Sequence, residues 1–474
     1  MNWAAEEMVD ADFGDIRLSQ RVVKLLNSFS NNPQSSIPNA CKDWYATKAA
    51  YRFFDNKKVT LENVLLPHKN KCIERIKQEK RILMVQDTTE LNYSSQKDKR
   101  DVGPGHSDND RVLFLHPLIA VTPDKVCLGI SDLHYWHREE LRRKTHTKKE
   151  LQTLRLHHQH ISEKESYRWL LGYRQATEVA IQCQDTHIIM VADRESDISD
   201  IYDEAQQTQG IKADWLIRAK VPNRVLLDEH GERDTVLLRN KLLLQVPSHV
   251  VTFTLPRRDK KPAQQVTQEI RTLRVQIHPP TGRRGKLRLR PFWVTALLAK
   301  QINTPAGEKP IEWLLLTSVS LSDDIQAHQI IQWYLCRWQI EVFFYILKSG
   351  CVVEQLQLTQ ASRFMPCIAL YCIVAWRIIT LTQLARANPE QNCECQFERI
   401  EWQLAFSHIY KKPPPHQPIT LADMLLLVAR LGGFLARKHD GNPGPKTIWR
   451  GLKRLDDFIE NYTTMNNLNF NTYG

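Results

Sequence analysis

The stretch "IIQWYLCRWQIEVFFYILKSG" (residues 330–350) is strongly apolar but carries a few polar residues at regular intervals. At offsets of 0, 3, 7 and 14 stand Tyr334, Arg337, Glu341 and Lys348. On an α-helix these offsets fall within an arc of roughly 60°. The segment therefore predicts one helix, buried on most sides, with a single polar stripe. Two interpretations fit the stripe: a solvated face with a salt bridge, or part of a functional site.

The composition is that of a folded protein with an anionic partner. The chain has 474 residues, of which 42% are hydrophobic and 25% charged, enough for two to four domains with a substantial core. A formal net charge of +12 makes nucleic acid the commonest partner for a protein of this size. Ribosome-associated proteins, enzymes of phosphate substrates and membrane-surface proteins have similar totals, so charge alone leaves these classes open.

The cysteines and the apolar segments bear on the compartment. The ten cysteines form no CxxC pair, which argues against a zinc ribbon or a disulfide framework and favours a reducing cytoplasm. The beginning of the chain, "MNWAAEEMVDADF", lacks the apolar core of a signal peptide. The longest apolar run, residues 364–376, is too short to span a bilayer and predicts a buried helix. We therefore expect a cytoplasmic protein with no membrane partner.

Patterning divides the chain into helical ends and an α/β middle. Residues 1–70 predict short helices with Lys and Arg outside, which suits either DNA binding or a merely solvated basic face. Residues 81–205 then read as three strands, a helix, a strand and a helix, the order of an α/β domain with a mixed sheet. Residues 212–320 alternate apolar and polar residues and predict an inserted β-rich unit. The chain beyond residue 385 is again helical in pattern.

Two aspartates follow apolar strands in the predicted α/β domain. Asp87 ends "RILMVQD" and Asp193 ends "HIIMVAD", where such sheets present functional groups. Each residue alone is equally typical of an ordinary turn. Two carboxylates on neighbouring strands repel each other unless a cation lies between them, and Mg²⁺ prefers hard oxygen ligands. A third carboxylate, for which Glu341 is a candidate, would allow two ions about 3.5–4 Å apart, the arrangement for in-line attack on a phosphodiester.

These motifs together resemble a known family. The segments "QDTTELNY" and "VADRESDI", with the spaced Tyr-Arg-Glu-Lys signature of residues 334–348, are similar to bacterial DDE transposases of the insertion-sequence-four family, most closely the Tn-five type. The resemblance extends to "AAYRF" near the beginning, "EWLLLTS" in the insertion and "ARLGGF" near the end. It therefore covers nearly the whole chain.

The resemblance implies a fold and a domain order. The fold class is α/β: a ribonuclease H-like catalytic domain with a large β-rich insertion, flanked by helical N- and C-terminal domains. The expected divisions are residues 1–70 for recognition of transposon ends, 71–385 for catalysis, with the insertion at about 212–320, and 386–474 for dimerisation. The implied partners are double-stranded DNA, both transposon ends and target, and a second copy of the chain once DNA is bound.

The resemblance also implies residue roles. The metal ligands and catalytic residues would be Asp87, Asp193 and Glu341, holding two Mg²⁺ ions, with Mn²⁺ as a possible substitute. Tyr334, Arg337 and Lys348 would hold DNA phosphates near the cleavage point. Trp313 would stack on a base flipped out of the duplex, and Arg218 would be a further DNA contact.

The function implied is cut-and-paste transposition by a bacterial protein that joins the nucleoid when bound to DNA. The enzyme would hydrolyse the phosphodiester at a transposon end, pass through a DNA hairpin and transfer the 3′ ends to target DNA. Two alternatives keep the same fold. One is a ribonuclease H-like, structure-specific nuclease without strand transfer, against which the long insertion with Trp313 argues. The other is a catalytically silent DNA-binding inhibitor of transposition, which the presence of all three acids disfavours.

Overall fold

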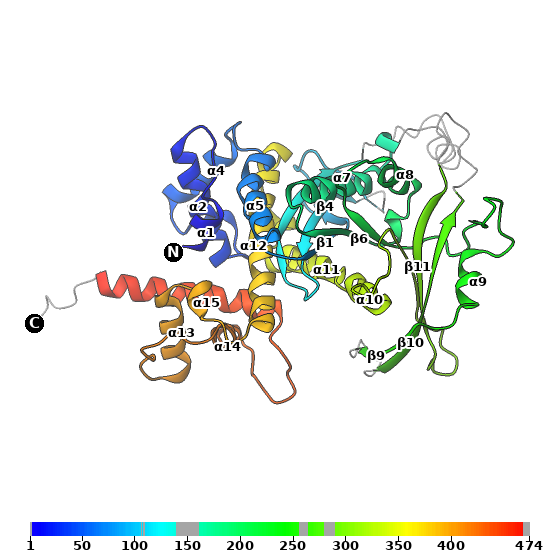
Figure 1. Ribbon diagram of the computed structural model, residues 1–474. Helices are drawn as coiled ribbons and strands as arrows, with labels where there is room; N and C mark the ends of the chain where they lie inside the picture. Colours follow the sequence, from blue (N-terminus) through cyan, green and yellow to red (C-terminus); the bar gives the residue numbers. More distant parts are fainter. Residues whose placement is uncertain are drawn as a thin grey trace, which may run out of the picture.

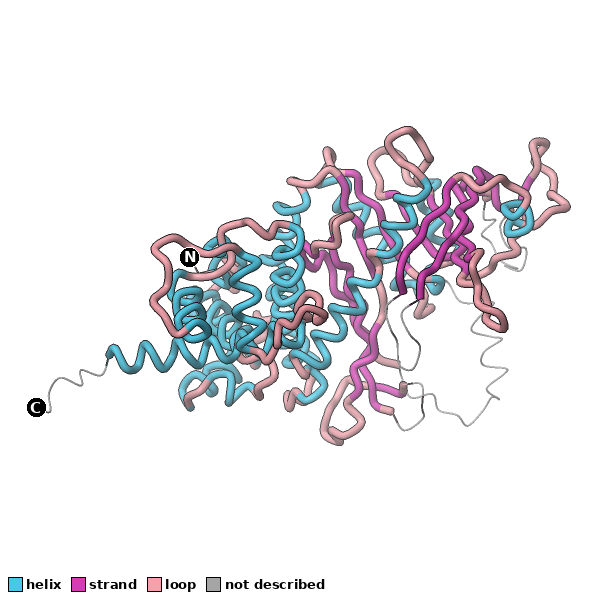
Figure 2. Tube along the Cα trace, turned by 90° about the horizontal axis from the view of Figure 1, so that it is seen from below, coloured by secondary structure: helices cyan, strands magenta, loops and turns pink. Residues whose placement is uncertain are grey.

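The computed structural model describes residues 2–105, 107, 110–138, 161–255, 264–278 and 290–467. Helices make up both ends of the chain, and the sheet with its covering helices makes up the middle (Figure 1). In the view of Figure 2 the helical ends gather on one side of the molecule and the strands on the other. The structure is thus α/β with a mixed sheet and helical termini.

The N-terminal helices begin at side chains that cap them. The side chains of Asp15, Asp43 and Thr60 each accept a hydrogen bond from a backbone N–H of the first turn of the helix that follows, as N-cap residues do. These helices are α1 (Trp3–Glu7), α2 (Ile16–Asn31), α3 (Ile37–Cys41), α4 (Trp44–Phe54) and α5 (Leu61–Ile76). Their apolar faces pack together and leave the basic residues outside, as the periodicity predicts.

In the part of the chain that the structure describes, the strands form one sheet of twelve. Its main path is β2-β4-β1-β6-β7-β12-β11-β10-β8, while β3 and β5 pair with β4 and β9 pairs with β10. The first strands are β1 (Arg81–Gln86), β2 (Thr89–Asn92), β3 (Gly103–Pro104), β4 (Arg111–Val121), β5 (Cys127–Trp136), β6 (His187–Ala192) and β7 (Asp214–Arg218). The pairs β1–β6 and β6–β7 are parallel, and β1–β4 and β4–β5 are antiparallel.

The β-rich insertion extends this sheet and does not form a separate unit. Strand β12 pairs with β7, so the inserted strands continue outward from the edge of the α/β part. They are β8 (Leu226–Leu227), β9 (His249–Leu255), β10 (Gln264–Ile277), β11 (Phe292–Gln301) and β12 (Glu312–Thr317). The expectation of a strand pattern in residues 212–320 is wrong in part, because the unit also contains helix α9 (Leu238–Leu243), whose Leu238 and Leu242 share one buried face. Residues 256–263 and 279–289 of this unit lie outside the described residues.

Around β1 and β6 both faces of the sheet are covered, and successive residues of these strands alternate between two hydrophobic cores. Leu83 and Val85 of β1 belong to the core that includes α11, whereas Ile82 and Met84 belong to the core under α7. Helices α7 (Tyr167–Gln182) and α8 (Ser199–Gln207) lie on one face, and α10 (Ala327–Leu335) and α11 (Trp338–Tyr345) on the other (Figure 1).

The opening segment of residues 330–350 is not one straight helix. Helix α10 ends at Leu335. Around Arg337 the backbone N–H groups donate to carbonyls three residues earlier, as in a 3-10 helix, and α11 follows. A π-helical turn, η3 (Ile346–Gly350), closes the segment and carries Lys348. The single polar stripe is therefore divided among two helices and a wide turn, and π turns of this kind are frequent at functional sites.

The helix α12 (Ala361–Ala387) joins the parts of the molecule. It is long and apolar enough to cross a membrane, but its apolar window is entirely buried inside the protein, as the sequence predicts for residues 364–376. It contacts α2, α4 and α5, strand β5, and the C-terminal helices, and occupies the centre of the molecule in Figure 1. The C-terminal helices are α13 (Arg399–Tyr410), α14 (Leu421–Leu431) and α15 (Pro445–Asn467).

Candidate active site

Asp87 lies in a short interruption of an extended strand. Gln86 pairs with Leu118 of β4, and Thr89 pairs with Leu115, so β1 and β2 keep one register with β4 on both sides of the gap. The residue of β4 opposite Asp87 in that register is Pro117, which has no N–H to donate to the ladder. The break in pairing at Asp87 thus follows from the sequence of the neighbouring strand, although β2 itself was not expected.

Asp193 stands at the same level of the sheet as Asp87. Val85 of β1 pairs with Val191 of β6, and each aspartate follows its valine by two residues. Neighbouring strands are about 4.8 Å apart, so the two carboxylates leave the sheet side by side. Period-two alternation directs both toward the face covered by α11, because Val85 and Val191 belong to that core.

Arg337 joins the first acid to the third. Its Nη1 donates to Asp87 Oδ2 at 2.8 Å, and its Nη2 donates to Glu341 Oε1 at 2.5 Å. The Arg337 side chain is 16% exposed and that of Asp87 is 21% exposed, so this contact is mostly desolvated. The structure therefore brings Asp87, Glu341 and Arg337 into one cluster, beside Asp193.

The electrostatics of the cluster are those of crowded acids. Burial raises the pKa of Asp87 to about 6, and the neighbouring Asp193 and Glu341 add to the rise, while Arg337 and the Thr88 N–H oppose it. The raised pKa therefore results mainly from desolvation of the carboxyl, together with the like charges nearby. Perturbed acids of this kind are typical of functional sites.

Three of the residues expected to contact DNA form a second group. Tyr334 is buried and lies beside Arg218, which donates a hydrogen bond to it; burial raises the pKa of the Tyr334 hydroxyl, while Arg337 and Arg218 oppose the rise. The indole of Trp313 is half-buried between Phe253 and Tyr334, with ring centroids 6.2 and 6.4 Å away. Phe253 covers the indole in a stacked geometry, a neighbour that sequence reasoning missed.

Lys348 stands apart from that group. It lies half-exposed in the π turn η3, at the far end of α11 from Arg337. The predicted row of Tyr334, Arg337 and Lys348 is thus not uniform: the tyrosine is buried, the arginine is bound to carboxylates, and the lysine is on the surface side.

Three protein families match the sequence in succession. Residues 1–59 match Transposase DNA-binding, residues 143–374 match Transposase DDE domain, and residues 373–468 match Transposase Tn5 dimerisation domain. The chain carries the domains of a DDE transposase. The transposase is thus a DNA-binding protein with a dimerisation domain, and its DDE match includes Asp193 and Glu341. Asp87 precedes that match, so its place in the site rests on the geometry above.

The acids fit a divalent cation, which DDE transposase domains generally use. The donor set is three carboxylates with hard oxygens. Burial is the main cause of the raised pKa of Asp87, and the neighbouring charges of Asp193 and Glu341, which a cation would offset, add to it. Among the described residues the acids whose oxygens all lie within 4.8 Å of one another are instead Asp456, Asp457 and Glu460. We favour the group of Asp87, Asp193 and Glu341, because the other trio already binds Lys42 through two of its members.

A buried polar network behind Asp87 escaped sequence reasoning. It consists of Gln86, Thr88, His116 and Arg168, from β1, the gap, β4 and α7. Burial lowers the pKa of His116 well below its usual range, with Arg168 and His134 adding to the effect, so this imidazole is neutral. The signal available was a histidine in the middle of the apolar strand "LFLHPLIAV".

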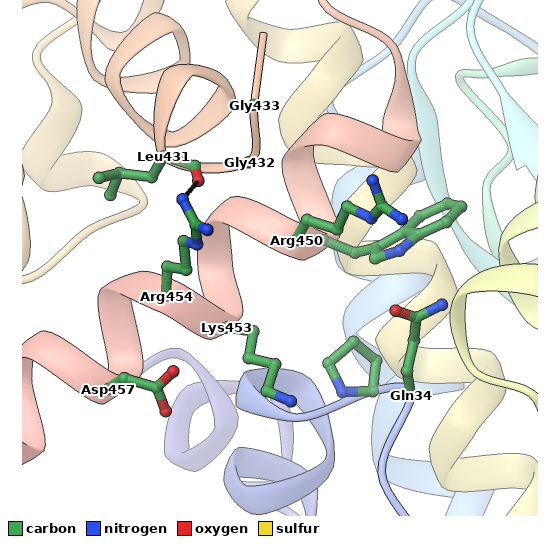
Figure 3. Close-up of a pocket in the computed structure, with 10 residues that line it drawn as sticks. Gln34, Leu431, Gly432, Gly433, Arg450, Lys453, Arg454 and Asp457 are labelled. Carbon is green, nitrogen blue, oxygen red and sulfur yellow. Dashed lines mark hydrogen bonds between the residues drawn. The ribbon is translucent and has the colours of Figure 1, made fainter.

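A cavity of about 470 Å³ lies elsewhere in the transposase, where α14 and α15 meet the loop at Gln34 (Figure 3). Arg450, Lys453 and Arg454 make its lining basic, and Arg454 donates to the carbonyl of Leu431 at 3.0 Å. It contains none of the acids of the candidate active site, so the cavity carries no part of the catalytic argument.

Proposed function

We propose that this chain is a cut-and-paste transposase of the insertion-sequence-four family, active in DNA cleavage and strand transfer. The observation that carries the proposal is the meeting of Asp87 and Asp193 at one level of adjacent parallel strands, with Glu341 tied to Asp87 through Arg337. This acidic group occurs in a chain with DNA-binding, DDE and dimerisation domains.

The proposed catalytic fold is ribonuclease H-like. Its support is the strand order β5-β4-β1-β6-β7, in which antiparallel strands lie on one side of β1 and parallel strands on the other. The proposed divisions are residues 1–70, 71–385 and 386–474. The boundary at residue 70 falls inside α5 (Leu61–Ile76), so we move this boundary to the loop after that helix.

We assign Asp87, Asp193 and Glu341 as the ligands of two Mg²⁺ ions, for which Mn²⁺ would substitute. Such ions, when bound, activate water and stabilise the leaving oxygen. The carboxylates hold this position because two strand ends and α11 fix their backbones. Asp87 and Glu341 must give up Arg337 to become ligands, which frees its guanidinium for a DNA phosphate. Lys348, in the π turn at the other end of α11, offers a second positive charge to the DNA.

The hairpin step would rest on the aromatic group. In this step the freed 3′-OH of the transposon end attacks the phosphodiester of the opposite strand. The new bond joins the two strands of that end as a hairpin, and the flanking DNA leaves with a 3′-OH. Hydrolysis then opens the hairpin before strand transfer. The sharp bend is relieved if one base leaves the duplex and stacks on an indole, worth roughly 1–3 kcal/mol. Trp313 is our candidate, with Arg218 and Tyr334 beside it. Since Phe253 stacks at 6.2 Å, the base must use the other side of the indole or displace Phe253.

Labelled transposon ends incubated with the protein and Mg²⁺ test the reaction on a denaturing gel. We expect nicked, hairpin and transfer products in turn, and their loss in Glu341→Gln with end binding retained. Nicks in many branched DNAs without transfer would favour the nuclease, and end binding without any cleavage would favour the silent inhibitor. Wild-type cleavage by Glu341→Gln would overturn the assignment of the triad.

Trp313→Ala separates the hairpin step from the first cut. Loss of stacking predicts normal nicking with hairpin formation slowed roughly tenfold or more, since about 1.4 kcal/mol corresponds to a factor of ten. Trp293, an exposed tryptophan of β11, provides the matched control in Trp293→Ala. Equal hairpin rates in both variants would remove Trp313 from the mechanism.

A further inference from the structure

One guanidinium contacts the loops of both aspartates. Arg168, the second residue of α7, donates from Nε to Thr88 Oγ1 and from Nη2 to Glu195 Oε2, both at 2.7 Å. Thr88 directly follows Asp87, and Glu195 follows Asp193 by two residues. The Arg168 side chain is only 11% exposed, and its Nη1 is held by the Glu165 carbonyl at 2.7 Å.

The two residues that accept hydrogen bonds from Arg168, Thr88 and Glu195, are also the residues that orient Asp87 and Asp193. The backbone N–H of Thr88 donates to Asp87 Oδ1 at 2.8 Å, and the backbone N–H of Glu195 donates to Asp193 Oδ1 at 2.8 Å. Each aspartate is therefore fixed by a residue whose side chain is bound to the same arginine. Movement of either loop would stretch a charge-assisted bond, which is stronger than a neutral one.

The same contact begins a hydrogen-bond chain with a single direction. Arg168 has donors only, so Thr88 Oγ1 accepts from it and donates its own proton to His116 Nδ1 at 2.8 Å. His116 then donates from Nε2 to Gln86 Oε1 at 2.9 Å, and the Gln86 amide donates to the carbonyl of Trp169 at 3.3 Å. The chain starts and ends on α7, and it holds the residue on each side of Asp87.

Packing leaves this network little freedom. A Cβ at Gly172 of α7 would lie 2.0 Å from Gln86 Oε1, so the helix approaches the strand closely only because this residue is glycine. The guanidinium also lies 5.2 and 5.3 Å from the ring centroids of Trp136 and Trp169. A fully satisfied, buried polar network of this kind rigidifies its surroundings.

We propose that Arg168 is a positioning residue that sets the separation of Asp87 and Asp193 and thereby the affinity of the acidic site for divalent metal. The inference rests on the proposed function, since it takes these aspartates as ligands. Arg168 itself reaches neither metal nor DNA in this role; it acts through Thr88 and Glu195. Partners of this kind, bonded to the groups that orient metal ligands, typically change metal affinity 10–100-fold when removed.

Mn²⁺ binding to the DNA-free, full-length protein, measured by electron paramagnetic resonance, provides the test. We expect Arg168→Ala to raise the dissociation constant at least tenfold and Arg168→Lys to restore only part of the loss, because one ammonium replaces a fork that spans two loops. Arg174→Ala is the matched control: it removes a fork from the same helix, bound to Glu204 and remote from the acids. Its Mn²⁺ affinity should equal that of the wild type.

Two further measurements separate the possible failures. If Asp87→Asn leaves Mn²⁺ binding unchanged, the proposed metal site itself is wrong. If Asp87→Asn weakens binding and folded Arg168→Ala does not, only the positioning role falls. Should Arg168→Ala unfold, Thr88→Val and Glu195→Ala each remove one of the two loop contacts of Arg168 and keep the arginine. Weaker Mn²⁺ binding in both supports the proposal, and unchanged binding in both overturns it.

Discussion

At the scale of single residues, the acid at position 87 opposes the stability of the protein that carries it. Its pKa of about 6, raised mainly by burial, lies above the ordinary value of 3.8. Folding therefore favours the protonated carboxyl, and the penalty for ionising it grows as the pH rises from 3.8 through 6 and is complete above that. Arg337 offsets only part of this penalty.

Asp87→Asn should therefore stabilise the metal-free protein at pH 7.5. The shift in pKa corresponds to roughly 3 kcal/mol at most, and we expect about half of that, because the amide leaves Arg337 with one charged partner fewer. Thermal unfolding in chelator should show a midpoint higher by about 1–2 °C, since a chain of this length shifts by roughly 1 °C per kcal/mol. Repeated at pH 5, where folded Asp87 is largely protonated, the gain should shrink. A lower midpoint at pH 7.5 would contradict this account.

The sequence was informative about residues whose signal is local. A short apolar run that ends in aspartate can be recognised in the sequence at Asp87 and Asp193. The alternation of such strands predicts that both side chains point to one face. The network of Thr88, His116 and Arg168 could not be predicted from the sequence, because His116 and Arg168 are 28 and 80 positions away from Thr88 in the chain. Only the pairing of β4 with β1 and the approach of α7 bring them together.

At the scale of elements, the same contrast holds. Periodicity predicted most strands and helices, yet nothing in it indicates that β12 pairs with β7 and makes one sheet of two units. Residues 330–350 were predicted to form one continuous helix, because a pattern with a period of 3.6 residues does not reveal the tight turn at Arg337 or the π turn at the end of the segment. Those two irregularities decide where Arg337 and Lys348 project.

Helices α14 and α15 depend on glycine where they cross. A Cβ at Gly451 would lie 1.8 Å from the carbonyl oxygen of Val428. Gly451→Ala should therefore push the helices apart and destabilise the dimerisation domain by about 1–3 kcal/mol. Amide hydrogen exchange should rise in both helices. Gly444, whose added Cβ would meet nothing within 4 Å, supplies the control in Gly444→Ala; equal exchange in the two variants would show that the crossing tolerates the extra atom.

At the scale of the whole molecule, a buried ionic contact joins the N-terminal helices to the sheet. Glu7 of α1 accepts from His68 Nδ1 of α5 at 2.5 Å and from Arg75, while His68 Nε2 accepts from the backbone N–H of Ile130 in β5 at 2.8 Å. His68 is thus neutral, and burial lowers its pKa, with Glu7 opposing and Arg75 adding. Burial raises the pKa of Glu7, but His68 and Arg75 outweigh it and hold the pKa below its usual range.

Both shifts predict loss of stability in acid. A group with a lowered folded pKa contributes stability above its unfolded value, near 6.5 for histidine, and loses it as the pH falls. Urea unfolding at pH 7.5 and 5.5 should show a smaller drop in stability for His68→Gln than for the wild type, by about 1.4 kcal/mol. The exposed His230 supplies the control, and His230→Gln should keep the full drop. An unchanged drop in His68→Gln would exclude this contact as its source.

The burial of α12 has a consequence for synthesis. This helix completes the core beneath the sheet and also the packing of the N- and C-terminal helices, yet it spans residues 361–387. A nascent chain on the ribosome exposes that side of its core until α12 has emerged. The strands made earlier therefore stay incompletely packed until this later segment is synthesised. The core that supports the candidate active site is therefore completed only after α12 has been synthesised. A message truncated before α12 should yield aggregates and no prematurely active nuclease.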